Sequence, residues 1–82
     1  MKQKAIESIE PVLKELKEDA AVPKNVKLKI EKVIGILKKN SEMTIKVSKA
    51  LNELEEVADD VNLQSYTRMQ VLNVMSALEK IK

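Results

Sequence analysis

Residues 5–40 read AIESIEPVLKELKEDAAVPKNVKLKIEKVIGILKKN, and their pattern recurs 41 positions later, where residues 46–81 read KVSKALNELEEVADDVNLQSYTRMQVLNVMSALEKI. Apolar and charged positions of the first stretch fall on similar positions of the second. The identical pairs are Leu13/Leu54, Glu15/Glu56, Asp19/Asp60, Val33/Val74, Leu37/Leu78 and Lys39/Lys80. Self-similarity at a fixed interval indicates one supersecondary unit used twice. The sequence therefore predicts one helical hairpin written twice.

The apolar residues within each half recur at intervals of three and four, which is the spacing of an amphipathic helix. The expected helices cover about residues 3–19, 23–39, 42–59 and 63–81. The residues expected to face inward are Ile6, Ile9, Val12, Leu13, Leu16, Ala20, Val26, Ile30, Val33, Ile34, Leu37, Met43, Val47, Ala50, Leu51, Leu54, Val57, Ala58, Thr67, Val71, Val74, Met75 and Leu78.

This pattern predicts an all-α fold, a compact antiparallel four-helix bundle built from two repeated helical hairpins, at about residues 5–40 and 46–81. A chain of 82 residues corresponds to a single domain, residues 1–82. Two stacked helical-repeat hairpins are the alternative arrangement.

Several residues predict how the helices begin and end. Pro11 removes a backbone hydrogen bond, so the first helix should either bend there or begin firmly only near that residue. Asn40, after two lysines, favours a left-handed cap at the end of the second helix. Ser41 and Asn62 are suitable N-caps for the third and fourth helices.

The composition excludes most catalytic chemistry. The chain has no Cys or His, and it has a single Gly. A di-metal site in a helical bundle requires a Glu-x-x-His motif, so the carboxylates at residues 53–60 lack the usual partner for binding metal. A glycine-rich phosphate loop is also missing. We therefore predict that the protein is not an enzyme and has no catalytic residue, metal, cofactor or small-molecule substrate.

The hydropathy of the chain indicates its compartment. The longest apolar run, residues 33–37, is far shorter than the ~20 residues of a membrane helix. The first residues, MKQK, lead directly into the amphipathic pattern without the core of a signal peptide. We expect a cytoplasmic protein that does not engage a membrane.

Some apolar residues lie outside the inward stripes and suggest a surface for a partner. Leu28 projects away from the inner face of its helix, and Met69 does so at the equivalent position of the second half. Small residues, Gly35 and Ser76, follow seven positions later. These residues, together with Leu72, could form notches for another helix, although scattered surface hydrophobes are common. We predict a non-catalytic protein–protein interaction module that associates with itself, as a homodimer, or with another protein.

The charge distribution supports an alternative function. Residues 24–39 carry six lysines and one glutamate, whereas residues 53–60 carry five carboxylates and no base. These charges could pair within the bundle, pair two copies, or meet an external polyanion. In the last case the protein would be an accessory nucleic-acid-binding protein whose candidate phosphate contacts are Lys24, Lys27, Lys29, Lys32, Lys38 and Arg68.

Residues 19–27, DAAVPKNVK, resemble a hallmark of the archaeal uncharacterised protein family 0147, in which an Asp precedes a Val-Pro-basic-Asn-aliphatic-Arg segment that opens the second helix. The second half of the family pattern reads Asp-Pro-Asn-Met-Pro, then Arg, then Ser-x-Leu-Glu. The matching residues here are DVNLQ at 60–64, Arg68 and SALE at 76–79. The resemblance covers nearly the whole chain.

Three positions depart from the family pattern. Gln64 stands where the family tends to have its second proline, Leu72 where a tryptophan is common, and Lys27 where arginine is usual. These departures argue against a role that depends on the tryptophan or on a forked guanidinium, whereas the fold should be retained. The resemblance implies a short archaeal four-helix protein of unassigned function.

Overall fold

The computed structural model describes residues 2–81, and the side chains of residues 4–81. Its elements are α1 (Lys2–Glu18), α2 (Lys24–Lys38), α3 (Met43–Ala58) and α4 (Ser65–Ile81). This part of the chain contains no strand, which confirms the predicted all-α class. None of the four helices is long and apolar enough to cross a membrane.

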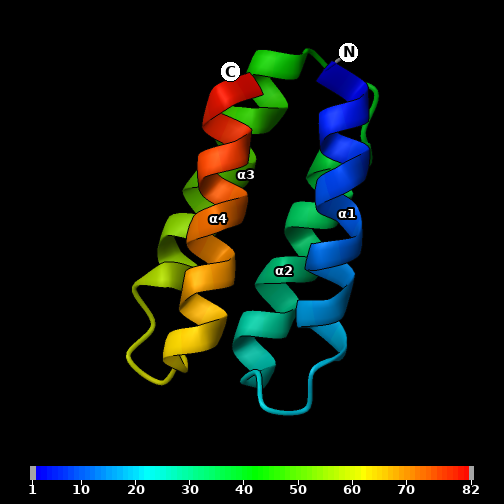
Figure 1. Cartoon of the computed structure of the whole chain (residues 1–82). Helices are drawn as coiled ribbons and strands as arrows, with labels where there is room; N and C mark the ends of the chain where they lie inside the picture. The colour runs from blue at the N-terminus through cyan, green and yellow to red at the C-terminus, as the bar shows by residue number, and fades with distance from the viewer. Residues whose placement is uncertain (1, 82) are drawn as a thin grey trace.

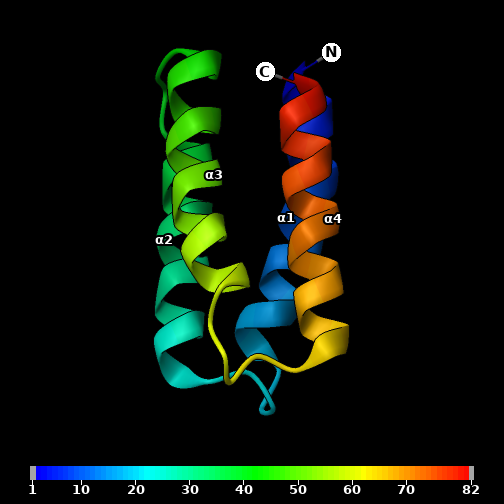
Figure 2. The same cartoon turned by 90° about the vertical axis from the view of Figure 1, so that its left-hand side faces the viewer.

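The helices run alternately up and down and form a square bundle of 33 × 18 × 18 Å. The turns 19–23 and 59–64 lie at one end, and the two chain termini lie at the other (Figure 1). Each helix packs against two neighbours, because α1 and α3 both contact α2 and α4. Within residues 2–81, the backbones of the diagonal pairs α1/α3 and α2/α4 bring no two Cα atoms within 8 Å of each other. Figure 2 shows the resulting pairs, α2 with α3 and α1 with α4. The predicted antiparallel four-helix bundle is confirmed.

The buried residues of all four helices form one core, and the repeat organises it. Leu13 and its equivalent Leu54 are fully buried, as are Leu37 and its equivalent Leu78. Four predicted inward residues lie at the edge of the core and are half-buried: Val12, Met43, Ala58 and Met75. Such a core of aliphatic side chains supplies most of the stability of helices this short.

One predicted inward residue is misplaced. Ala20 is exposed, because α1 ends at Glu18 and the chain turns before Ala20 can continue the stripe. Val22 enters the core at the end of that turn and is 4% exposed. Val22 therefore contributes to the core in place of Ala20, for which the helical period predicted an inward position.

The predicted caps are also wrong. α3 begins at Met43 with Glu42 at its N-cap, so Ser41 lies outside the helix. α4 begins only at Ser65, and Asn62 belongs to a turn held by Asp60. α2 ends at an extended Lys39, and no residue in the described range adopts a positive φ.

The first helix is continuous through Pro11. α1 extends from Lys2 to Glu18 with the proline inside it. Of the two alternatives, a helix that begins only near Pro11 is therefore excluded. Pro11 itself is exposed, so the backbone hydrogen bond that it cannot donate is lost on the solvent side of α1 rather than on the side of the core.

Candidate functional site

The five predicted interaction residues all lie on the outside of the bundle. Leu28 and Met69, at equivalent positions of α2 and α4, are each 60% exposed, and Leu72 is 49% exposed. Gly35 and Ser76 are exposed as well. A Cβ added to Gly35 would meet nothing within 4 Å, so the surface at Gly35 is open.

These five residues form two separate surfaces rather than one. Leu28 and Gly35 lie on the outer side of α2, whereas Met69, Leu72 and Ser76 lie on the outer side of α4. α2 and α4 occupy diagonal corners of the bundle, so their outward sides face in opposite directions (Figures 1 and 2). We call them the α2 face and the α4 face.

The two halves share the hydrogen bonds of their turns as well as their apolar pattern. Asp19 Oδ1 accepts the backbone N–H of Ala21 at 2.9 Å, and Asp60 Oδ1 accepts that of Asn62 at 2.8 Å. In each turn the N–H three residues after the aspartate donates to its carbonyl, at 3.1 and 3.2 Å. The repeat is therefore structural, and residues 41 positions apart occupy equivalent places.

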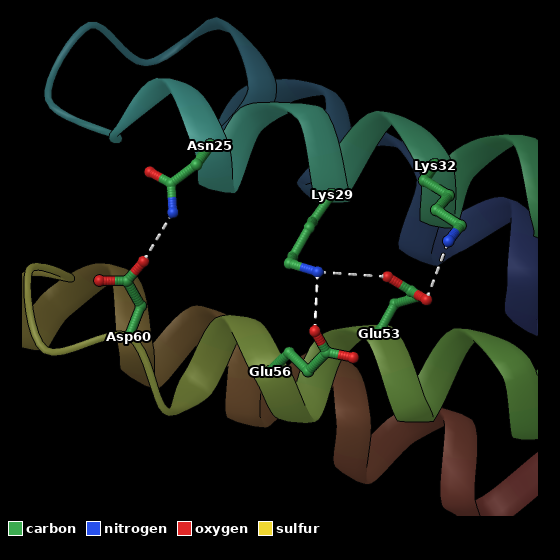
Figure 3. Close-up of polar contacts among 6 residues, drawn as sticks. All are labelled: Asn25, Lys29, Lys32, Glu53, Glu56 and Asp60. Carbon is green, nitrogen blue, oxygen red and sulfur yellow. Dashed lines mark hydrogen bonds and ion pairs between the residues drawn. The ribbon is translucent and has the colours of Figure 1, made fainter.

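A ladder of polar contacts closes the outer seam between α2 and α3 (Figure 3). Lys29 Nζ lies 2.8 Å from Glu56 Oε1 and 3.7 Å from Glu53 Oε1. Lys32 Nζ lies 3.1 Å from Glu53 Oε2. These contacts join the lysine-rich and carboxylate-rich segments of the sequence, so part of the uneven charge is paired within the bundle. We call these contacts, with the Asn25–Asp60 bond below, the polar ladder.

The end of the polar ladder involves the turn aspartate. Asn25 Nδ2 donates to Asp60 Oδ2 at 2.9 Å. Hydrogen bonds from the Asn62 backbone and then from Asn25 lower the pKa of Asp60. The hydrogen bond with Lys29 lowers the pKa of Glu56, and the same bond raises the pKa of Lys29. Each shift favours the charged form that makes the contact.

The structure disperses the six candidate phosphate contacts. Lys29 and Lys32 point toward α3 and its carboxylates. Arg68 lies on the diagonal helix, where its Nε donates to the Ala58 carbonyl at 2.9 Å and its Nη2 to the Asp60 carbonyl at 2.7 Å. These bonds satisfy carbonyls at the C-terminal end of α3. The remaining candidates, on or beside the α2 face, are Lys24, Lys27 and Lys38.

Three of the five carboxylates at residues 53–60 make contacts with α2. Glu53, Glu56 and Asp60 belong to the polar ladder. Across the described residues, no group of three or more metal-ligating side chains is placed to hold an ion. The geometry therefore gives Glu53, Glu56 and Asp60 a structural role, because they hold α3 and the turn after it against α2.

The opposite seam, between α1 and α4, carries two shallow hollows that share Gln70 in their linings and that the sequence analysis did not identify. Its end nearer the turns is a pocket of about 360 Å³ lined by Glu15, Leu16, Glu18, Asp19, Tyr66 and Gln70. Its other part, about 350 Å³, is more apolar, and its lining includes Ile9, Val12, Asn73, Val74 and Ala77. We call the two together the α1–α4 groove.

The repeat explains why this seam is open. A shift of 41 residues relates the α2–α3 seam to the α1–α4 seam, so each contact of the polar ladder has an equivalent pair. The equivalents of Asn25–Asp60, Lys29–Glu56 and Lys32–Glu53 are Tyr66–Asp19, Gln70–Glu15 and Asn73–Val12. Both lysines are thus replaced by shorter neutral amides, while two carboxylates remain. Applying the shift to the charged residues would have shown from the sequence that the α1–α4 seam lacks the lysines of the α2–α3 seam.

Comparison with known proteins agrees with the resemblance noted in the sequence. The chain is similar to UPF0147 proteins of Pyrococcus horikoshii, with 35% identity over 98% of this chain and 88% of the relative, and of Thermococcus kodakarensis, with 34% identity over 94% and 95%. A UPF0147 protein of Methanocaldococcus jannaschii is 28% identical over 98% and 87%. No solved structure matches the chain. The model of the uncharacterised protein family UPF0147 matches residues 1–81, and the chain belongs to this family.

Proposed function

We propose that this protein is a non-catalytic helical interaction module that associates with a second copy or with another protein through its α2 and α4 faces. The observation that carries the proposal is the repeated exposure of a large apolar side chain, Leu28 and Met69, at equivalent positions. Each is followed seven residues later by a small exposed residue, which leaves room for an approaching side chain.

The chemistry of the described residues supports an interaction role. The pKa shifts of Lys29, Glu56 and Asp60 arise from contacts in the polar ladder, at positions that hold helices together. Perturbed groups of a catalytic site instead tend to gather in a cleft. Exposed apolar side chains at repeated positions are better suited to a partner helix.

Sedimentation equilibrium of the native chain and of the double variant Leu28→Lys/Met69→Lys tests this proposal. We expect the variant to lose association while its far-UV circular dichroism stays unchanged, because surface substitutions usually alter stability by about 0.5 kcal/mol or less. Val61→Lys is the control, because Val61 is 90% exposed but lies in a turn outside both faces. A native chain that is monomeric at high concentration and recovers no partner in a pull-down would contradict the proposal.

A further inference from the structure

The α1–α4 groove lacks the cations that fill the equivalent seam. Along the α2–α3 seam, the Lys29 and Lys32 side chains reach across to carboxylates of α3. In the α1–α4 groove their equivalents, Gln70 and Asn73, are shorter and neutral. The groove therefore keeps acidic side chains at one end without a lysine to cover them.

The carboxylates at that end are available to an external cation. Glu15 and Glu18 are exposed and, within the described part of the chain, make no ion pair. Asp19 accepts the Ala21 N–H of its turn with Oδ1. Its equivalent Asp60 accepts the Asn62 N–H with Oδ1 and also accepts Asn25 Nδ2 with Oδ2. The ring of Tyr66 lines the same pocket and offers an aromatic face to a cation.

The α2 face of this protein has the complementary charges. Lys24 and Lys27 flank Leu28 near the start of α2, and neither makes an ion pair within residues 4–81. Gly35 lies further along the same face and is open. Exposed Glu31 and Lys32 separate Leu28 from Gly35, so the part of the α2 face that complements the acidic pocket is its first turn, with Lys24, Lys27 and Leu28.

The lengths of the two surfaces agree as well. The groove runs along α1 from Ser8 to Asp19, and the α2 face runs from Lys24 to Gly35. Both stretches rise about 16 Å at 1.5 Å per residue. A helix presenting the α2 face can therefore lie along the groove with Lys24 and Lys27 at the acidic pocket.

We propose that the α1–α4 groove of one chain receives the α2 face of a second copy, with Lys24 and Lys27 placed against Glu15, Glu18 and Asp19. Leu28 then lies toward the apolar part of the groove. This inference rests on the proposed function and gives the α2 face a specific partner surface. Lys24 and Lys27 of the second copy then pair with carboxylates of the α1–α4 seam, as Lys29 and Lys32 pair with carboxylates of the α2–α3 seam within one chain.

Charge reversal tests this contact in sedimentation equilibrium at low salt. We expect Glu15→Lys/Glu18→Lys to weaken self-association by about tenfold or more, because like charges then meet across the contact. Glu7→Lys/Glu79→Lys is the matched control, since it makes the same charge change on exposed residues of α1 and α4 outside the groove lining. The control should associate like the native chain.

A charge swap distinguishes the specific contact from a general effect of net charge. Lys24→Glu/Lys27→Glu alone should also weaken association, and combining it with Glu15→Lys/Glu18→Lys should restore association. A swap variant that stays dissociated, or a native chain that is monomeric throughout, overturns the inference. If Leu28→Lys/Met69→Lys abolishes association while the groove reversal has no effect, the inference fails and the proposed interaction function stands.

Discussion

At the scale of single residues, the repeat allows the contacts of a residue in one half to be compared with those of its equivalent in the other half. Arg68 in α4 donates to the carbonyls of Ala58, at the end of α3, and of Asp60, in the turn that follows, and its equivalent in the first half is Lys27 in α2. A guanidinium presents several donors in a fixed fork, whereas an ammonium acts as a point charge. Across the described residues, the first hairpin therefore lacks the two guanidinium hydrogen bonds that close the second.

We expect Arg68→Ala to lower the free energy of unfolding by about 1–3 kcal/mol, because it removes hydrogen bonds from a charged donor to part-buried carbonyls. Lys27→Arg should raise it by about 0.3–1 kcal/mol, since a guanidinium there can bind the equivalent end of α1. Urea denaturation of both variants measures these changes. An Arg68→Ala variant as stable as the native chain would show that the two bonds do not hold the hairpin.

At the scale of the helices, the polar ladder joins α2 to α3 and should make stability depend on pH. Glu56 and Asp60 have a lowered pKa, so their contribution is present above their ordinary values, 4.5 and 3.8, and is lost as the pH falls through the lowered values. Lys29 has a raised pKa, so its contribution is present below 10.5 and is lost as the pH rises through the raised value.

The melting temperature should therefore be highest between these limits. Glu56→Gln should lower it at neutral pH and flatten its fall in acid, because the variant has no carboxylate to protonate at that position. Glu55→Gln is the control, since Glu55 lies on the same helix outside the polar ladder. Identical acid profiles for the native chain and Glu56→Gln would show that the Lys29 contact is not coupled to folding.

At the scale of the whole molecule, the arrangement of helices weakens the alternative of nucleic-acid binding. Lys29 and Lys32 are paired with α3, and Arg68 lies on the helix diagonal to α2. The affinity for nucleic acid increases with the number of phosphates that cations on one surface can contact. We therefore expect no measurable binding of mixed RNA or duplex DNA near physiological salt. Fluorescence anisotropy at two salt concentrations measures this. Tight binding that collapses with salt and is weakened by Lys24→Glu/Lys27→Glu for all sequences would establish the phosphate-binding function instead.

The sequence by itself determined the helices, most of the core and the repeat, because an apolar stripe depends only on the local 3.6-residue period of a helix. Leu13, Leu37, Leu54 and Leu78 were all predicted to face inward, and all are fully buried. Only the tertiary structure decided which helices are neighbours. A short turn places α2 beside α3, and closure of the bundle places the first helix, α1, beside the last, α4. This arrangement brings Lys29 to Glu56, separates the α2 and α4 faces, and leaves the α1–α4 groove open. Such contacts join residues far apart in the chain, so no local pattern contains them.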